Sequence, residues 1–292
     1  HGAPAPEDPR ALAAAVDEPT DRIVVLLHGL AETTAAWTWW STTDDGTPVP
    51  TYAERLADVG WTPLEIGYNT GLAVVANGER LSRFVADVVE AWPTPVQEIA
   101  LVGHSMGGLV AGAACHHGLI AEQGWTDLVS HVVSLGTPHA GSWLARLAHG
   151  GASMAARLPE TRGLATFLDL RSDGIKDLTR GWRPTLDDPT LDDPSADAEE
   201  RAAAAILTLA ALLPYAQHAF VASRLGRTRR GPLVHLVGDG LVHPRSAIAP
   251  ARAARHAPNV VVRQHQGVGH IRLVHHPAVG DDLVEWMAPR RT

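Results

Sequence analysis

The sequence predicts an α/β protein built on a mostly parallel, doubly wound sheet of about six strands. Two observations support this prediction. Short apolar runs rich in β-branched residues alternate with helix-prone segments, and one such run leads through a Gly-x-Ser-x-Gly turn directly into a helix-prone segment. Continuous apolar runs are typical of strands buried on both faces, and their alternation with helices favours parallel crossovers. The length of 292 residues suits one large α/β domain, or such a domain with an insertion.

The predicted elements begin after a lead-in of residues 1–20, which is rich in Pro and Ala and carries one short helix at 10–16. The apolar runs predict strands at residues 23–27, 61–68, 98–102, 128–135, 233–237 and 260–264. Helical patterns fill the intervals at residues 50–59, 79–91, 109–120 and 279–286. Gly60 and Pro93 mark where two of these helices end.

The alternation breaks at residues 143–230, a long and mostly helical stretch that contains an acidic, Pro-rich loop at 184–194. We interpret 143–230 as a helical cap or lid inserted into a core made of residues 21–142 and 231–292. The apolar run 202–213 is too short to span a bilayer. It could meet a lipid surface as part of the lid or pack over the site, and we favour packing.

Composition narrows the classes of partner. The formal net charge of −8 argues against a nucleic-acid partner. Cys115 is the single cysteine, so no intrachain disulfide can form, and no apolar run is long enough to span a membrane. The chain begins at His1 rather than Met, which leaves open a removed signal peptide, and we expect a cytoplasmic rather than a secreted protein. The oligomeric state is left open.

The segment centred on Ser105 is the strongest functional signal. Residues 103–107 read Gly-His-Ser-Met-Gly between a predicted strand and a predicted helix. In such a tight turn the residues two before and two after the serine must lack a side chain, and the serine projects its hydroxyl from the sheet edge. We therefore expect Ser105 to be a nucleophile.

A serine nucleophile needs a base and a group that orients the base. Asp239 follows the predicted strand 233–237 between two glycines, which places it at the carboxyl edge of the sheet. His270 follows the last strand, the position a base takes in the chain order Ser, Asp, His. His275 and His276 are the rival bases. The less suitable acids lie in a polar loop, in the insertion or before a strand: Asp187, Asp188, Asp192, Asp193, Asp169, Asp173, Asp177 and Asp127.

The remaining site predictions concern charge stabilisation and substrate contacts. Two backbone N–H groups, those of Leu30 and Met106, are the expected oxyanion donors. Other side chains near the expected edge are candidates for lining an apolar acyl pocket: Trp37, Trp39, Trp40, His104, His139 and Trp143. For the tryptophans, an ordinary place in the core is the alternative, and His28, His104 and His139 fit structural roles better than that of a base. No histidine spacing indicates a metal site, so we expect no metal and no cofactor.

These residues resemble the lipase branch of the α/β-hydrolase fold, and bacterial hydrolases related to the GPI-inositol-deacylase family in particular. The segments that carry the resemblance are His28-Gly29, Gly103 to Gly107, Gly136 to His139 with Gly141-Ser142, Asp239 to Val242, and His270. Secondary similarities are Tyr68 to Gly71 with Asn77-Gly78, and His270 to Pro277 with Val279. The resemblance implies a triad of Ser105, Asp239 and His270 and a helical lid. The first two strands of a full eight-stranded sheet are not visible in residues 1–20, which suggests the smaller, lipase-like core.

The sequence thus predicts a serine hydrolase, an esterase or lipase, that cleaves small-molecule or lipid carboxylic esters through an acyl-enzyme. Calcium occurs in some lipases of this fold, but no ligand set for it is recognisable here. An acyltransferase or amidase with the same triad is the first alternative, because only the acceptor differs. A non-catalytic binding module on the same fold is the second, and the intact set of Ser105, Asp239 and His270 argues against it.

Overall fold

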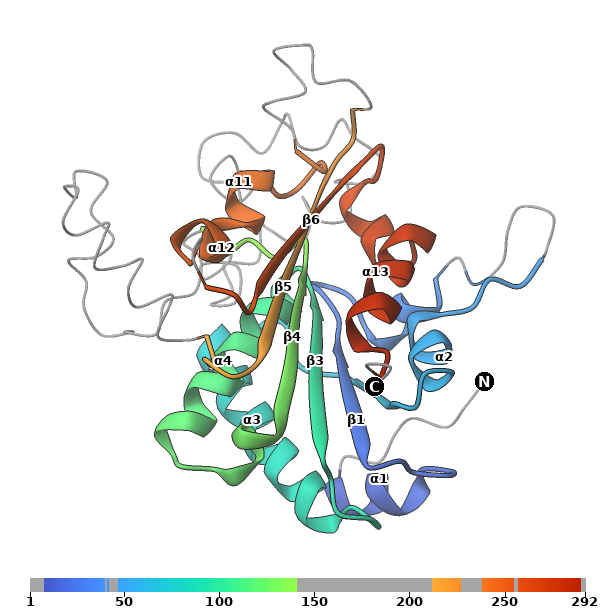
Figure 1. Ribbon diagram of the computed structural model, residues 1–292, viewed down its shortest axis with the longest axis vertical. Helices are drawn as coiled ribbons and strands as arrows, with labels where there is room; N and C mark the ends of the chain where they lie inside the picture. The colour runs from blue at the N-terminus through green and yellow to red at the C-terminus, as the bar shows by residue number, and fades with distance from the viewer. Residues whose placement is uncertain are drawn as a thin grey trace.

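The computed structural model describes residues 8–39, 41, 47–140, 212–226, 238–254 and 257–289. Within them, six strands form one sheet in the order β2-β1-β3-β4-β5-β6, and every neighbouring pair is parallel (Figure 1). The strands are β1 (Arg22–Leu27), β2 (Thr62–Ile66), β3 (Glu98–His104), β4 (Val129–Leu135), β5 (Gln217–Arg224) and β6 (Val260–Gln266). The predicted parallel, doubly wound sheet is confirmed.

Helices connect these strands and cover the sheet. The helices and 3₁₀ turns are α1 (Pro9–Ala15), η1 (Thr34–Thr38), α2 (Tyr52–Ala57), α3 (Val74–Ala91), α4 (Met106–Ile120), η2 (Gly124–Leu128), α11 (Pro244–Ala247), α12 (Ala249–Ala253), η4 (His270–Val274) and α13 (Pro277–Met287). Thr51 and Glu54 begin α2 with a reciprocal capping box, which satisfies two N–H groups at the helix start. In the described part of the chain, no helix is long and apolar enough to cross a membrane.

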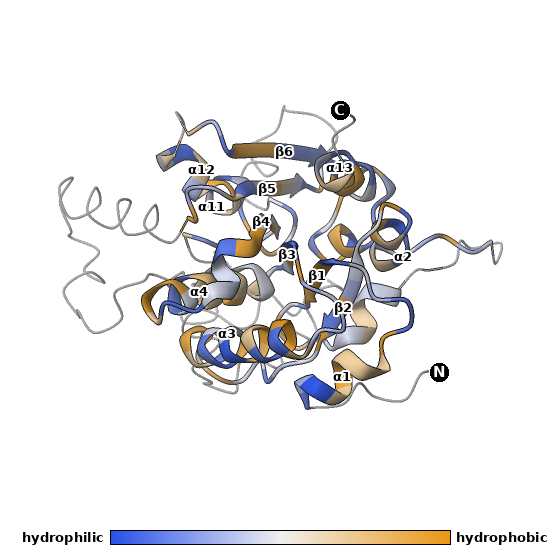
Figure 2. Ribbon diagram, turned by 60° about the horizontal axis from the view of Figure 1, so that its bottom comes forward, coloured by the Kyte–Doolittle hydropathy of each residue, from blue (hydrophilic) through white to orange (hydrophobic). Residues whose placement is uncertain are grey.

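The sheet is covered on both faces, and the side-chain period of two in β1 shows how. Ile23, Val25 and Leu27 pack into the hydrophobic core shared with α1, α3 and α4, whereas Val24 and Leu26 pack into a second core with α2 and α13. Figure 2 shows these two helical layers on opposite sides of the strands. A strand buried on both faces has no polar side, which is why residues 23–27 form an uninterrupted apolar run.

Helix α3 begins earlier than predicted, because Asn77 and Gly78 lie inside it and not before it. A Cβ atom placed on Gly78 would lie 2.4 Å from the Cβ of Ala113 in α4. Gly78 therefore allows close contact between α3 and the helix that follows Ser105.

The predicted boundary of the insertion at residue 230 is wrong. Residues 217–224, assigned to the helical cap, form β5 and pair with β4 and β6 inside the core sheet. Burial explains this, since β5 is buried over its six central residues. The predicted strand 233–237, the acidic loop 184–194 and most of the predicted cap lie outside the described residues.

The carboxyl ends of the strands converge on one edge of the sheet. Strand β1 leads into His28, β3 leads into Ser105 and β4 leads into Gly136. At the end of β5, the N–H of Leu225 donates to the carbonyl of Gly238, the residue before Asp239. Because parallel strands all end at the same edge, segments far apart in the sequence meet there.

Candidate active site

Ser105 lies between β3 and α4 with φ of 52° and ψ of −119°, a conformation that non-glycine residues rarely adopt. Its N–H donates to the carbonyl of Leu135 at 2.9 Å, which fixes the turn to the end of β4. Met106 directly follows and is the first residue of α4, so its N–H lies at a helix N-terminus. The sharp strand-to-helix turn expected from residues 103–107 is present.

The two glycines of the turn lie where no side chain fits. A Cβ atom on Gly103 would be 2.3 Å from the backbone nitrogen of Gly108. One on Gly107 would be 2.3 Å from the carbonyl oxygen of Leu27, at the end of β1. Backbone contact between β3, α4 and β1 thus requires glycine at both positions.

Asp239 and His270 form a buried pair. The Nδ1–H of His270 donates to Oδ2 of Asp239 at 2.8 Å, and both side chains are almost fully buried. The other carboxylate oxygen accepts from the N–H groups of Leu241 at 3.0 Å and Val242 at 2.7 Å. The backbone N–H of His270 also donates to the carbonyl of Asp239. These bonds fix the carboxylate and select the ring tautomer with the proton on Nδ1.

The pair lies beside the serine turn. A Cβ atom on Gly136, whose preceding residue accepts the N–H of Ser105, would be 3.1 Å from Nδ1 of His270. The rings of His104 and His270 have centroids 4.8 Å apart. Among the described residues, no hydrogen bond joins the hydroxyl of Ser105 to the ring of His270. The elements thus bring Ser105, Asp239 and His270 to one place, and the proton transfer between serine and histidine belongs to the proposal below.

The loop after β1, which carries Leu30, lies against the serine turn. A Cβ atom on Gly107 would lie 2.3 Å from the carbonyl oxygen of Leu27 and 2.7 Å from that of His28. Tyr68 holds this loop from the other side, because its hydroxyl donates to the carbonyl of His28 at 2.6 Å and its ring stacks on that of His28. The segments that carry the N–H groups of Leu30 and Met106 are therefore neighbours.

Glu32, which the sequence analysis did not select, is part of this arrangement. Its Oε2 accepts from the N–H of Gly29 at 2.6 Å and lies 3.0 Å from Nδ1 of His104. Burial alone would raise the pKa of Glu32, but the charge and hydrogen bond of His104 outweigh it and lower that pKa to about 2. The one sequence signal for Glu32 is that a carboxylate follows the carboxyl end of β1. Its partner His104 lies 72 residues away in the sequence, so no local pattern connects the two.

The predicted pocket residues are distributed differently from the prediction. Trp37 is fully buried in the core between the sheet, α2 and α13, near Tyr52, which is the core position that the sequence left open as the alternative to the pocket. Trp39 is 37% exposed, and Trp40 and Trp143 lie outside the described residues. The ring of His104 faces Glu32 and the backbone of His270, which leaves it no surface for a substrate.

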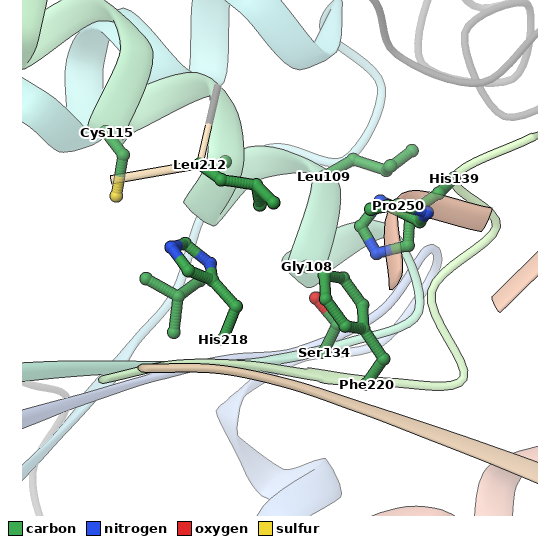
Figure 3. Close-up of a pocket in the computed structure, with 11 residues that line it drawn as sticks. Gly108, Leu109, Cys115, Ser134, His139, Leu212, His218, Phe220 and Pro250 are labelled. Carbon is green, nitrogen blue, oxygen red and sulfur yellow. The ribbon is translucent and has the colours of Figure 1, made fainter. Parts of the chain in front are cut away.

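His139 lines a small interior cavity of about 40 Å³ on the α4 side of the sheet. Figure 3 shows His218 and Phe220 extending from β5 toward Leu109 and Cys115 of α4, with His139 at the other end. Burial and the nearby His218 lower the pKa of His139 to about 3, so its ring is neutral at physiological pH. The cavity holds at most a few water molecules and is too small for an acyl chain.

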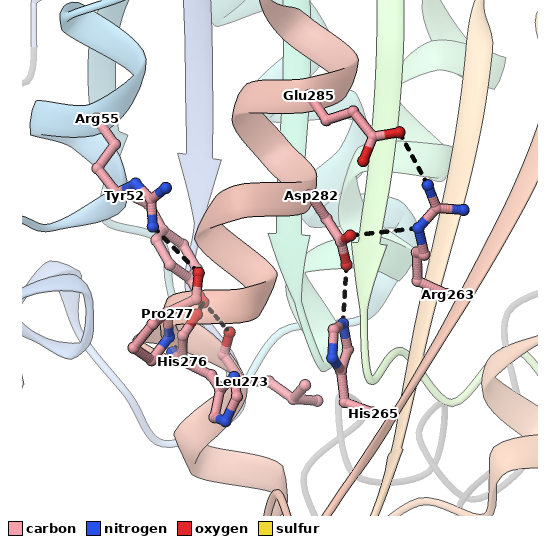
Figure 4. A network of polar contacts seen from close by, with 9 residues as sticks. All are labelled: Tyr52, Arg55, Arg263, His265, Leu273, His276, Pro277, Asp282 and Glu285. Carbon is pink, nitrogen blue, oxygen red and sulfur yellow. Dashed lines mark hydrogen bonds and ion pairs between the residues drawn. The ribbon is translucent and has the colours of Figure 1, made fainter.

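Tyr52 anchors the segment that follows His270. Its hydroxyl donates to the carbonyl of Leu273 at 2.8 Å and accepts from the N–H of His276 at 2.9 Å (Figure 4). The turn η4 and the start of α13 are thereby fixed to α2. Within the described residues, no group of three or more His, Cys, Asp or Glu side chains could hold a metal ion.

Known proteins share this architecture. A family model described as a PGAP1-like alpha/beta domain matches residues 73–154, the part that holds α3, β3, the serine turn and β4. No curated protein sequence matches this chain.

Several solved structures align over nearly the whole chain. A Bacillus licheniformis lipase in mature form is 19% identical with a TM-score of 0.59, covering 94% of this chain and 95% of that one. An esterase of Pyrococcus furiosus is 18% identical with a TM-score of 0.53, covering 92% of this chain and 84% of that one. A Staphylococcus hyicus lipase is 12% identical with a TM-score of 0.51, covering 98% of this chain and 97% of that one.

Proposed function

Starting from the α/β-hydrolase fold that this chain shares with those lipases and esterases, we propose that it is a serine hydrolase that cleaves carboxylic esters through an acyl-enzyme. The observation that carries the proposal is the buried pair of Asp239 and His270, joined at 2.8 Å, at the sheet edge where the strained turn presents Ser105. A fold alone does not define an activity, but this combination of groups has a defined chemistry.

In the proposed reaction, the hydroxyl oxygen of Ser105 attacks the ester carbonyl carbon and Nε2 of His270 accepts its proton. Asp239 accepts the Nδ1–H of His270 and stabilises the imidazolium. The N–H groups of Leu30 and Met106 stabilise the oxyanion, and each such donor is typically worth about 10²- to 10³-fold in rate. The alcohol leaves with the proton from His270. Water then repeats the sequence on the acyl-enzyme and releases the carboxylic acid.

The experiment is a series of nitrophenyl esters of rising acyl length, with triglyceride emulsions alongside, assayed for the wild type and three variants. S105A is expected to lose both ester hydrolysis and labelling by a fluorophosphonate. H270A is expected to be nearly as severe, whereas H275A, which removes the rival base, should cost little. Labelling that persists in S105A, or the reverse ranking of the two histidines, would contradict the proposal.

The acceptor is tested separately, since an acyltransferase or amidase would use the same groups. A competing alcohol or amine is added and the products are analysed. Release of free acid as the main product supports a hydrolase, and dominant transfer to the added acceptor contradicts it. The acyl length with the highest kcat/KM separates an esterase from a lipase.

A further inference from the structure

His104 and Glu32 form a second buried histidine–carboxylate pair next to that of His270 and Asp239. The side chain of His104 is completely buried, and Nδ1 lies 3.0 Å from Oε2 of Glu32. Its other nitrogen, Nε2, lies 3.1 Å from the backbone carbonyl oxygen of His270. The mechanism proposed above uses neither side chain.

The partners of His104 determine its protonation. Both ring nitrogens face oxygen atoms, and a carbonyl oxygen can only accept, so Nε2 carries a proton. Nδ1 faces a carboxylate that already accepts the N–H of Gly29, so it donates as well. His104 is therefore an imidazolium paired with an ionised Glu32. Burial opposes this charge, but Glu32 and the carbonyl of His270 together raise the pKa of His104 above its ordinary value.

Other titratable groups lie near the pair, but the carboxylate bonded to the ring of His104 is that of Glu32. Asp239 adds a negative charge near His104, and His28 lies near both members with a pKa that burial lowers, so it stays neutral. Tyr68 faces Glu32 with a phenol whose pKa burial raises. The charged His104 thus faces one directly bonded carboxylate.

The pair joins three segments that the reaction needs in fixed positions. Glu32 binds the N–H of Gly29, next to the expected oxyanion donor Leu30. His104 precedes Ser105 in the turn, and its Nε2–H donates to the backbone of His270. A shift of about 1 Å in a reacting group can cost about 10²-fold in rate, so contacts that fix these segments affect the chemistry directly.

We propose that Glu32 and His104 are positioning residues: a buried ion pair that holds the oxyanion loop, the nucleophile turn and the catalytic histidine in register. This inference rests on the proposed esterase function. Neither side chain contacts the substrate, and the pair acts through Gly29 and through the backbone of His270.

The kinetic test compares E32A with E32Q. Both contacts of Glu32 are made by Oε2, so the amide oxygen of a glutamine can take that place and accept from the N–H of Gly29 and from the Nδ1–H of His104. The connections then survive while the negative charge is removed. Alanine removes them all. We expect E32A to lower kcat on a nitrophenyl ester by about 10²-fold with KM nearly unchanged, and E32Q to recover most of that loss. An E32A variant that retains wild-type kcat, or E32Q as inactive as E32A, would overturn the proposal.

The spectroscopic test measures the protonation of His104 in the wild-type protein directly. Nitrogen-15 NMR of histidine-labelled protein, with the His104 signals assigned by their loss in H104Q, reports how many ring nitrogens carry a proton. We expect two in the wild type at neutral pH, and in E32Q, which lacks the negative charge that raises the pKa of His104, we expect one of them to be lost at a lower pH than in the wild type. A neutral His104 in the wild type would contradict the ion pair.

The matched control variant breaks a histidine–carboxylate pair in another part of the fold. His265 in β6 and Asp282 in α13 form a histidine–carboxylate pair at 2.8 Å that makes no contact with the triad (Figure 4). D282N should leave kcat unchanged, and a loss equal to that of E32A would show that a generic loss of stability is being measured. If the wild type hydrolyses no ester, the fluorophosphonate labelling rate of Ser105 replaces kcat, so failure of the proposed function remains distinct from failure of the positioning role.

Discussion

Replacing Asp239 with asparagine tests the arrangement of the triad with almost no change of shape. Oδ1 of Asp239 accepts two backbone N–H groups, at 3.0 and 2.7 Å, so the amide oxygen of an asparagine must take that place. The amide NH₂ then faces Nδ1 of His270, where the carboxylate oxygen lies at 2.8 Å. Two donors cannot share that bond, so Nδ1 gives up its proton and Nε2 becomes the protonated nitrogen. In the proposed reaction, Nε2 is the atom that accepts the proton of Ser105.

The expected loss follows from that change of tautomer. Holding a triad histidine in the wrong tautomer costs about 10⁴-fold in kcat, which corresponds to about 5 kcal/mol in the activation barrier. The free energy of unfolding should change far less, because every hydrogen bond of the native side chain has a counterpart in the variant. A large loss of rate with little loss of stability is the signature of this mechanism.

The assay measures kcat and KM on a nitrophenyl ester at neutral pH, with thermal unfolding followed in parallel. D127N is the control, since Asp127 lies in η2 before β4, at the opposite end of the sheet from the serine turn, and should retain wild-type kcat. A D239N variant that kept more than about a tenth of the wild-type kcat would refute the role given to Asp239.

Three further predictions concern stability and its link to the site. G103A should be destabilised by about 3 kcal/mol or more, since its Cβ would meet backbone atoms of α4; thermal unfolding of G124A, where the added Cβ meets nothing within 4 Å, is the comparison and should be near wild type. Y52F should lower the free energy of unfolding, measured with urea, by about 1–3 kcal/mol, because the carbonyl of Leu273 and the N–H of His276 lose their partner. We expect kcat to fall as well, and unchanged values for both quantities would contradict the anchoring role. Burial would raise the pKa of Glu32, but the charge and hydrogen bond of His104 lower it from its ordinary value of 4.5 to about 2 in the folded chain. Its stabilisation is therefore present above pH 4.5 and lost as the pH falls toward 2. In E32Q, the free energy of unfolding from urea titrations should not show this loss between pH 4.5 and 2. Identical pH profiles for the wild type and E32Q would disprove the prediction.

The fold was largely predictable because its strands are buried on both faces. Residues 23–27 and 99–102 are continuous apolar runs, and the structure places both in interior strands of the sheet. Strand β5 was missed since its sequence includes the buried polar residues His218 and Ser223, which interrupt the apolar pattern. The sequence shows that such residues are polar, but it does not show that they are buried.

The candidate site was predictable where strand ends carry the chemistry. Ser105, Asp239 and His270 follow predicted strands, and the carboxyl-edge rule brings them together. Glu32 was missed because its role depends on contact with His104, which no local pattern reveals. Trp37 was assigned to the pocket from its place in a loop, but packing against α2 and α13 buries it. The places of Glu32 and Trp37 depend on contacts between segments that are distant in the sequence, whereas the places of Ser105, Asp239 and His270 follow from local signals at strand ends.

The close backbone contacts around Gly103 and Gly107 also bear on how the proposed hydrolase could diversify. The closest contacts at Gly103 and Gly107, on either side of Ser105, are made with main-chain atoms of α4 and of the end of β1. For the proposed hydrolase, substitutions in the surrounding loops that leave these backbone contacts and the pair of Glu32 and His104 intact can change which substrate is accepted. Substrate preference could then vary one loop at a time while the proposed nucleophile stays in place.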